Sequence, residues 1–337
     1  MRRIDLKQIT VQYLYGAKAV DSLSVTLSAG ERLAVFAEAE GGKTSLLKAI
    51  AGLLPVASGT MTTEEGVDFA RLPVRARDVQ MIYHGEGLFL RRSARANLAY
   101  PLKVRKVKRA ARLQAVEEGA KNFGLIPILN DPVKLLFEDD RVRLQFARAS
   151  LRQGAVLLID DPLRDAPRER SALFEELVVP LKRPDGIMVY ATDNREEALT
   201  FDRVVVLRYG AAEQIATPAE LRENPATLYV DRMFNRHRNR RPTDTVLQPD
   251  GTRMVEICGR RLLLPADAAR VICSYVLEAT EGEMPVTGVF PCGAGWLLET
   301  EEGLVLSDTF KTRTGAEVQG EIFCFSEESE KRLTIPT

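Results

Sequence analysis

Apolar residues recur along the first 235 residues in short runs that are separated by segments of helix length. The segment Leu23–Leu27 alternates apolar and polar residues, as a strand with one exposed face does. Continuous apolar runs predict further strands that are buried on both faces, at Arg32–Phe36, Ala155–Ile159, Gly186–Tyr190 and Arg203–Leu207. Buried strands that alternate with helices favour a parallel sheet covered on both sides, which is an α/β fold.

The pattern changes between Met233 and Thr245, where arginines crowd together before a proline. The rest of the chain consists of short strand-like pieces with Gly, Pro and Asp turns, and only Pro265–Ala269 suggests a helix. We therefore expect two domains: an α/β domain over residues 1–235 and a small all-β domain over residues 236–337. We interpret the arginine cluster as a solvated linker, because it lacks the interleaved aromatic residues of an RNA-binding segment.

Composition removes several classes of function. Lys and Arg total 47, as do Asp and Glu, so the formal net charge is zero. This balance argues against a general binder of nucleic acid or anionic membranes, although it leaves local patches open. The longest apolar run, residues 49–57, is too short to cross a bilayer, and the N-terminus lacks the apolar core of a secretory signal. We expect a cytosolic protein.

Cysteine and histidine content narrows the chemistry further. The cysteines show no C-x-x-C pair, so we interpret them as small buried residues in a reducing compartment. The two histidines, His84 and His237, are too few to favour a zinc site or a Ser-His-Asp hydrolase. The cysteines are Cys258, Cys273, Cys292 and Cys324.

The clearest chemical signal is a phosphate-binding loop at residues 37–44, which follows a predicted strand and precedes a predicted helix at 45–50. In such a loop, backbone N–H groups surround phosphate oxygens, Lys43 supplies a positive charge and the Thr44 hydroxyl reaches Mg²⁺. A glycine-rich turn with a solvated lysine is the alternative. The candidate nucleotide-binding residues are Ala37, Glu38, Ala39, Glu40, Gly41, Gly42, Lys43, Thr44 and Ser45.

Carboxylates near the loop affect this site in two ways. Glu38 and Glu40 bring negative charge close to a site for anions, so we expect weakened rather than abolished phosphate affinity. Asp160 ends a predicted strand, where a carboxylate would hold the water shell of Mg²⁺ beside the loop. Thr44 and Asp160 are therefore the candidate metal residues, the alternative for Asp160 being a turn residue before Asp161-Pro162.

These features resemble the ATP-binding subunits of ABC transporters, specifically the maltose-type carbohydrate importers, over nearly the whole chain. Besides the phosphate loop, the resemblance rests on Tyr15-Gly16 and on the segments 51–59, 147–149, 217–225 and 325–332. It implies a P-loop NTPase domain with a helical subdomain at about 88–152, followed by an OB-like β-barrel domain. It also implies ATP and Mg²⁺ as cofactors, with Tyr15 stacking on adenine.

Several family motifs are replaced in this chain. Residues 136–140, Leu-Phe-Glu-Asp-Asp, stand where the family has its Leu-Ser-Gly-Gly-Gln signature. The three carboxylates suit the start of a helix but would repel the partner subunit's ATP. Asp161 replaces the family's catalytic Glu and is shorter by about 1.5 Å. His84 stands in place of the Gln that senses γ-phosphate, either contacting a metal-bound water or acting as a loop histidine, and Asp193 replaces the switch histidine.

The resemblance therefore implies a subunit that binds MgATP but hydrolyses it weakly, with Asp161 as the shortened base. The expected partners are a second, complete ABC ATPase subunit in a heterodimer, membrane-spanning permease subunits and, indirectly, a solute-binding protein, but no nucleic acid. The expected location is peripheral, on the cytoplasmic face of the cell membrane, and the expected solute is a sugar or polyol. A catalytically inactive regulatory or scaffold protein is the alternative, and a soluble P-loop kinase is disfavoured.

A basic run lies within the expected helical subdomain. As a charge run it is either a solvated face or a contact with lipid headgroups or membrane subunits. Its members are Lys103, Arg105, Lys106, Lys108, Arg109 and Arg112.

Overall fold

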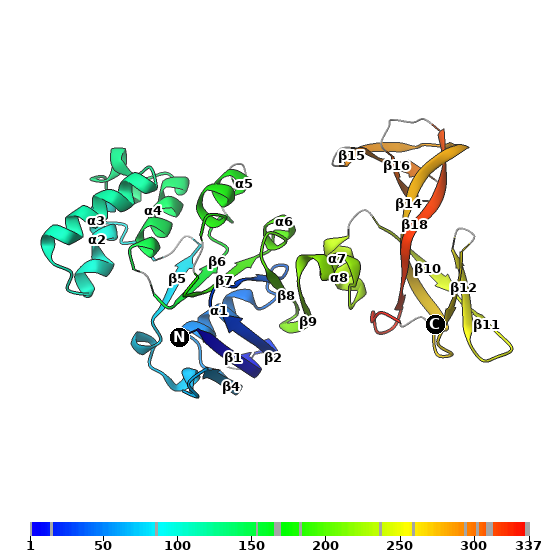
Figure 1. Cartoon of the computed structure of the whole chain (residues 1–337), viewed down its shortest axis with the longest axis horizontal. Helices are drawn as coiled ribbons and strands as arrows, with labels where there is room; N and C mark the ends of the chain where they lie inside the picture. The colour runs from blue at the N-terminus through cyan, green and yellow to red at the C-terminus, as the bar shows by residue number, and fades with distance from the viewer. Residues whose placement is uncertain are drawn as a thin grey trace. The chain divides into compact units, whose positions relative to one another are not determined.

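The computed structural model describes residues 2–13, 16–84, 87–152, 154–164, 170–181, 184–235, 238–257, 260–292, 295–300, 303–307 and 313–333. The chain divides into two compact units, Met1–Pro218 and Ala219–Thr337 (Figure 1). None of the helices in the described ranges combines the length and the hydropathy that crossing a bilayer requires.

The first unit is built on a sheet of six strands in the order β5-β6-β7-β3-β8-β9. All neighbours are parallel except β8 and β9, which pair antiparallel. The buried runs predicted from the sequence form the middle of this sheet, so the prediction of a parallel sheet is confirmed. The strands are β3 (Arg32–Phe36), β5 (Val79–Tyr83), β6 (Val156–Asp160), β7 (Ile187–Thr192), β8 (Arg203–Arg208) and β9 (Ala211–Ala216).

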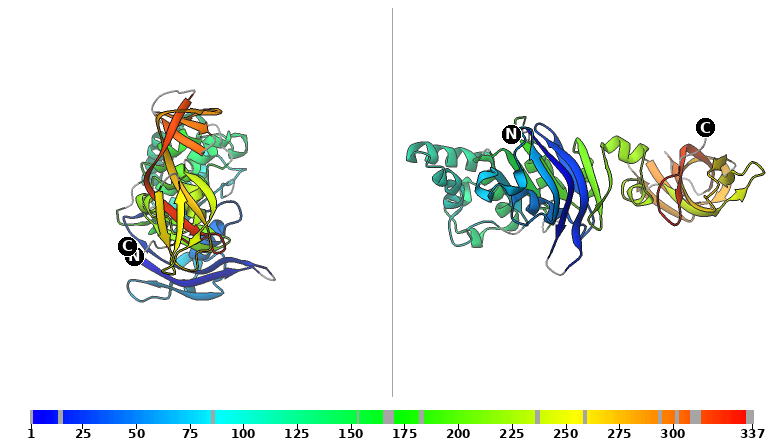
Figure 2. Two further views of the ribbon diagram at one scale, coloured as in Figure 1. Left: turned by 90° about the vertical axis from the view of Figure 1, so that its right-hand side faces the viewer. Right: turned by 90° about the horizontal axis from the view of Figure 1, so that it is seen from below.

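A second, antiparallel sheet of the first unit has the order β2-β1-β4. Helix α1 (Lys43–Ala51) contacts strands of both sheets, and its buried Leu46, Leu47 and Ile50 join one hydrophobic core with them. Figure 2 shows the long strands β1 and β2 running alongside the central strands. The strands are β1 (Arg3–Gln12), β2 (Lys18–Ser28) and β4 (Ser58–Thr63).

A helical subdomain is inserted between β5 and β6 and packs around its own apolar cluster. Its helices are α2 (Ala94–Val104), α3 (Arg109–Asn122) and α4 (Glu138–Ser150), which lie together in Figure 1. Between β6 and β8 the chain forms α5 (Arg170–Leu173), a π-helical turn (Phe174–Val178) and, after β7, α6 (Arg195–Ala198). The P-loop NTPase fold with a helical insertion agrees with the sequence prediction.

The second unit is rich in β-structure. A six-stranded sheet joins β10, β14, β15, β16, β17 and β18, and a separate sheet has the order β11-β12-β13. A β-rich C-terminal region was expected, while its description as an OB-like barrel stays a prediction. The strands are β10 (Asn239–Asp244), β11 (Val246–Leu247), β12 (Arg253–Ile257), β13 (Arg260–Leu264), β14 (Arg270–Pro285), β15 (Gly288–Cys292), β16 (Gly295–Thr300), β17 (Gly303–Ser307) and β18 (Arg313–Ser326).

Two short helices, α7 (Pro218–Glu223) and α8 (Leu228–Phe234), precede these strands. Asp231 of α8 is fully buried, and its Oδ2 accepts hydrogen bonds from Arg240 Nε at 2.7 Å and from Ser274 Oγ at 2.7 Å. Because Arg240 and Ser274 belong to β10 and β14, this carboxylate fastens α8 to the β-rich unit. The compact units accordingly divide at residue 218, earlier than the expected boundary at 235, and the functional assignment of the domains stays a prediction.

Two further sequence expectations concern the second unit. The helix expected at Pro265–Ala269 is wrong: these residues form a turn between β13 and β14. Thr245 and Arg253 donate hydrogen bonds to carbonyls of this turn, so tertiary contacts determine its conformation. Cys273 and Cys324 are free and buried, as expected for small apolar residues.

Candidate functional site

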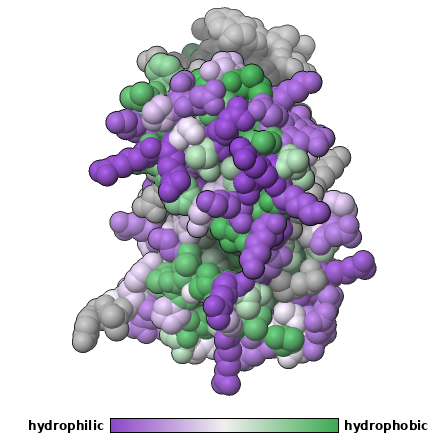
Figure 3. Space-filling view, turned by 90° about the vertical axis from the view of Figure 1, so that its left-hand side faces the viewer, coloured by the Kyte–Doolittle hydropathy of each residue, from purple (hydrophilic) through white to green (hydrophobic). Residues whose placement is uncertain are grey.

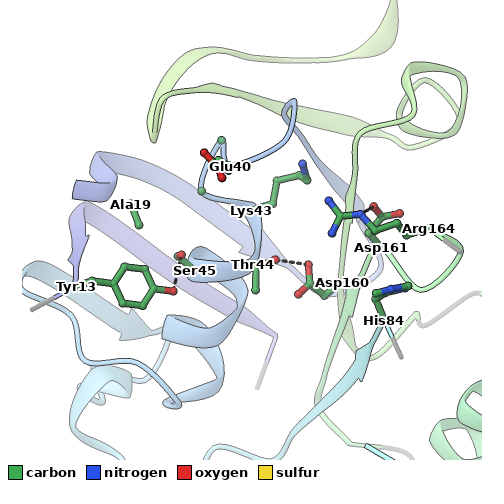
Figure 4. A pocket seen from close by; sticks show the side chains of 12 residues that line it. Tyr13, Ala19, Glu40, Lys43, Thr44, Ser45, His84, Asp160, Asp161 and Arg164 are labelled. Carbon is green, nitrogen blue, oxygen red and sulfur yellow. Dashed lines mark hydrogen bonds and ion pairs between the residues drawn. The ribbon is translucent and has the colours of Figure 1, made fainter. Parts of the chain in front are cut away.

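A cavity of about 280 Å³ opens where the loop before α1 meets the ends of β5 and β6 (Figure 4). Carboxyl ends of parallel strands are the usual location for ligand sites in sheets of this kind. The residues that line it are Tyr13, Ala19, Glu40, Gly41, Gly42, Lys43, Thr44, Ser45, His84, Asp160, Asp161 and Arg164.

The glycines of the loop are required by its close backbone contacts. A Cβ atom at Gly42 would lie 2.1 Å from the carbonyl oxygen of Ala19, and Gly42 has a φ of 96°. A Cβ atom at Gly41 would lie 2.5 Å from the Ala37 side chain. α1 follows without a side-chain cap, and its first residues line the cavity, so its first amides are available to an anion as phosphate-binding loops require.

Lys43 is buried and turns back on its own loop. Its Nζ donates to the carbonyl oxygens of Ala37 at 2.5 Å and Glu38 at 2.9 Å. Burial lowers the pKa of the Lys43 ammonium, and this effect is opposed by the charges of Asp193 and Asp161. The Lys43 ammonium group is thus held by carbonyls of its own loop at the lining of the cavity.

Thr44 and Asp160 meet across the cavity, although 116 residues separate them in the chain. The Thr44 hydroxyl donates to Asp160 Oδ1 at 3.0 Å (Figure 4). Burial raises the pKa of Asp160, and the Thr44 hydrogen bond counteracts this shift. A hydroxyl and a carboxylate oxygen at one site fit Mg²⁺, which proteins hold through one or two such oxygens plus phosphates and water.

Asp161, the expected base, is held in an ion pair. Arg170 Nη2 donates to Asp161 Oδ1 at 3.0 Å, and Arg164 Nε lies 3.8 Å from Asp161 Oδ2. Both carboxylate oxygens therefore face guanidinium groups. Burial raises the pKa of Asp161 to about 6 despite the opposing charge of Arg170. Asp161 also has a φ of 38°, a left-handed conformation that is rare for residues other than glycine.

Arg170 belongs to a network behind the cavity that the sequence did not reveal. Its Nη2 also donates to Thr192 Oγ1 and to Glu197 Oε2, each at 3.0 Å, and its Nε donates to Glu197 Oε1 at 2.5 Å. Glu197 is buried and accepts a further bond from the Tyr190 hydroxyl at 2.9 Å. Arg170 Nη2 lies 3.4 Å from Asp193, the residue expected in place of the family's switch histidine.

The other predicted residues divide into two groups. Glu40 and His84 line the cavity, whereas Glu38 is exposed and does not. Glu40 has a φ of 61°, so it adopts a left-handed conformation within the loop. Tyr15, the predicted adenine contact, lies outside the described residues.

Three cavity residues were missed by sequence analysis: Tyr13, Ala19 and Arg164. Tyr13 packs its hydroxyl 3.1 Å from Ser45 Oγ (Figure 4). The strand pair β1–β2 brings Tyr13 and Ala19 to the loop, a contact that a local motif does not record. For Tyr13, the signal available in the sequence was an aromatic side chain two residues before Tyr15.

The acidic segment at 138–140 begins α4, as the sequence predicted. All three carboxylates lie in the first helical turn, where they stabilise the helix dipole. Leu135 and Phe137 just before it are 69% and 81% exposed. An acidic helix start beside large exposed apolar side chains is poorly suited to hold a phosphate.

Comparisons with known proteins match this geometry. The ABC transporter family matches residues 20–164. The chain is 30% identical over 273 residues to the sn-glycerol-3-phosphate import ATP-binding protein UgpC of Cereibacter sphaeroides, covering 80% of this chain and 76% of the relative. It is 34% identical over 232 residues to the trehalose import ATP-binding protein SugC of Mycobacterium tuberculosis, covering 68% and 59%.

A further relative is the diacetylchitobiose uptake system ATP-binding protein MsiK of Streptomyces coelicolor, 33% identical over 63% of this chain and 56% of its own length. The alignments to SugC and MsiK thus span less than two thirds of those relatives. Among solved structures, cbiO1 of Clostridium perfringens, described as part of the ABC transporter complex cbiONQ, matches with a TM-score of 0.57 and 19% identity. It covers 65% of this chain and 89% of that one, and supports the fold.

Proposed function

This chain belongs to the ABC transporter family of ATP-binding proteins, and we propose that it serves as the ATP-binding subunit of an import system for a sugar or polyol-type solute. The relatives above are named for the import of glycerol phosphate, trehalose and diacetylchitobiose, all of which are polyhydroxylated solutes. The membership supports the general role, and the names of the relatives favour this class of solute.

The pairing of Thr44 with Asp160 beside Lys43 is the observation that carries the proposal. These three side chains come from α1 and β6 and line one cavity. When MgATP is bound, Mg²⁺ supplies charge that neutralises the phosphates. The chain's own part is to present the loop amides and Lys43 to the phosphates, and Thr44 and Asp160 to the metal.

We infer weak turnover from the surroundings of Asp161. A general base must accept a proton from its water, and here Arg170 and Arg164 engage both carboxylate oxygens. The side chain is also shorter than the family's Glu. The chain therefore holds nucleotide more readily than it activates water.

A complete paralogue is the partner that these departures favour. Two copies of this chain would each present the acidic start of α4 to the other's nucleotide, and like charges repel. The exposed Leu135 and Phe137 offer apolar contact area beside that acidic turn. We propose a heterodimer in which the paralogue contributes the intact signature to the cavity of this chain.

A groove in the first unit supports docking of a membrane-spanning permease. It has a volume of about 520 Å³ and lies between β5 and the helices α2 and α4. Aromatic and aliphatic side chains line it together with arginines, as suits an amphipathic partner helix. The residues are Tyr83, Phe89, Tyr100, Val104, Arg105, Arg148 and Arg152, among others. Such docking would place the chain on the cytoplasmic face of the membrane.

Mg-ATP binding and phosphate release by the purified chain test this function. We expect wild-type protein to bind MgATP and release phosphate slowly, and Lys43→Ala to lose binding. Lys121→Ala is the matched control, because Lys121 is an exposed cation on α3 away from the cavity. Fast release that requires Lys43 would contradict the weak turnover. Failure of the wild-type chain to bind MgATP would favour the regulatory or scaffold alternative.

A further inference from the structure

The turn between α2 and α3 carries a cluster of exposed cations. Lys103 lies in the last turn of α2, and Lys106, Lys108 and Arg109 follow within the turn and at the start of α3. We call these four residues the basic turn. All four are exposed, and among the described residues none of their side chains forms an ion pair or hydrogen bond.

Acidic residues are missing from this part of the sequence. No Asp or Glu occurs from Gly87 to Val116. Two carboxylates that contact this segment are paired with its other cations: Asp78 lies 3.2 Å from Arg105, and Glu117 lies 2.5 Å from Arg95. The cations in the segment are Arg91, Arg92, Arg95, Lys103, Arg105, Lys106, Lys108, Arg109 and Arg112. A protein of zero net charge thus concentrates positive charge on one end of its first unit.

This arrangement opposes the stability of the isolated fold. Like charges at neighbouring positions repel, and α3 begins with cations and no acidic residue in its first turn, the opposite of what the helix dipole favours. An external anionic surface would relieve both effects. Figure 3 views this end of the molecule and shows hydrophilic side chains projecting from it, with apolar patches between them.

Apolar side chains beside the cations indicate which anionic surface fits. Val104, next to Lys103, is 63% exposed. Leu113, one helical turn after Arg109, is 46% exposed. Cations combined with exposed aliphatic side chains are typical of segments that rest on anionic bilayers, where the charges meet headgroups and the aliphatic groups enter the interface. Val104 also borders the groove proposed for the permease, so a docked permease would bring the membrane near.

We propose that the basic turn binds the anionic surface of the lipid bilayer directly. This contact adds to any attachment through a permease and needs no nucleotide. Its partner is the negatively charged headgroup layer, recognised by several unpaired cations rather than by a single lipid pocket.

Sedimentation of the full chain with lipid vesicles, without nucleotide or permease, tests the proposal. We expect binding to vesicles that contain phosphatidylglycerol but not to pure phosphatidylcholine vesicles, and loss of binding at high salt. The variant Lys103→Gln, Lys106→Gln, Lys108→Gln, Arg109→Gln should bind more weakly by about fivefold for each cation removed. The matched control removes the exposed cations Lys7, Lys121, Lys134 and Lys331, which lie outside this segment, so both variants carry the same net charge.

Three results would overturn the proposal. The first is no binding of the wild-type chain to anionic vesicles at low salt. The second is an equal loss in both variants, which would mean that overall charge rather than the basic turn is responsible. The third is unimpaired vesicle binding by the basic-turn variant together with lost association with a permease complex, which would assign the surface to an acidic protein face. Because the assay omits ATP, its failure leaves the nucleotide-binding proposal unaffected.

Discussion

The guanidinium of Arg170 donates from Nη2 to Asp161 Oδ1 at 3.0 Å, so the carboxylate that we expect to act as the base is held by a charged neighbour. The same Arg170 nitrogen serves Thr192 and Glu197. Two buried carboxylates, Asp161 and Glu197, therefore share this one cation. This arrangement gives the residues around Asp161 a structural role as well as a place at the cavity.

Arg170→Gln should lower the free energy of unfolding by about 3–5 kcal/mol, because it leaves buried Glu197 without its cation. Arg170→Lys keeps the charge but not the several hydrogen bonds, so its loss should be smaller. Urea denaturation of both variants measures the difference. Equal losses would show that the shape of the guanidinium, and not its charge, supports the network.

Asp161→Glu should raise the rate of phosphate release in the presence of a complete partner subunit. The added methylene extends the carboxylate by about 1.5 Å toward the cavity, and a well-placed base contributes about 10²–10⁴-fold. Asp161→Asn is the control, because it cannot accept the proton. If the two variants turn over ATP at the same rate, the base is not the limiting group in this site.

Glu40→Gln should tighten MgATP binding by roughly tenfold, because it removes a carboxylate at the cavity. Glu40→Gly removes the same charge and should bind MgATP equally well, while relief of the left-handed conformation should raise its free energy of unfolding by about 1 kcal/mol. Glu38→Gln changes the net charge equally but lies outside the cavity lining, so it should change little. Isothermal titration of the three variants measures the effect of the charge, and urea denaturation measures the effect of the backbone conformation.

Thr44→Val should weaken ATP binding in the presence of Mg²⁺ and have little effect in its absence. The valine matches the shape of threonine but lacks the hydroxyl that contacts Asp160 at 3.0 Å. Thr44→Ser keeps the hydroxyl and should retain most of the metal dependence. Binding titrations with Mg²⁺ and with a chelator measure this. A metal dependence that survives in Thr44→Val would remove Thr44 from the metal site.

The contribution of Asp161 to the free energy of unfolding should fall as pH rises from about 4 to 6. Burial raises the pKa of Asp161 from 3.8 to about 6, so the folded state binds this proton more tightly than the unfolded state. The stabilisation is complete at low pH and is lost as Asp161 ionises. Asp161→Asn lacks this titration and should gain up to about 3 kcal/mol over wild type between pH 4 and 7. Parallel stability–pH curves for the two proteins would contradict it.

Much of the first unit followed from the sequence because its signals are local. The buried strands are short apolar runs, and the phosphate loop is a contiguous motif next to one of them. The meeting of Thr44 and Asp160 was predictable for the same reason, since each lies at a recognisable position of its own segment. Periodicity and motif spacing are sufficient to predict a contact when each of the two residues can be recognised from the sequence around it.

The parts that were missed depend on contacts between distant segments. Arg170 is one charged residue among many, and only the packing of α5 and α6 against β7 brings it to Asp161 and Glu197. Pro265–Ala269 has the composition of a short helix, but the side chains of Arg253 in β12 and of Thr245 between β10 and β11 donate to its carbonyls. A local pattern contains no information on such partners, so propensity gave the wrong answer there.

The buried Asp231 affects where this chain can be recombined with a relative. Its hydrogen bonds to Arg240 and Ser274 make α8 part of the C-terminal unit, although the sequence attaches that helix to the nucleotide-binding half. A recombination event or a designed chimera that exchanged C-terminal halves after residue 235 would separate the carboxylate from Arg240 and Ser274 and leave it with only the side-chain amide of Asn235. A crossover near residue 218 would carry the pair intact, so exchange between relatives should be tolerated best at that point of the chain.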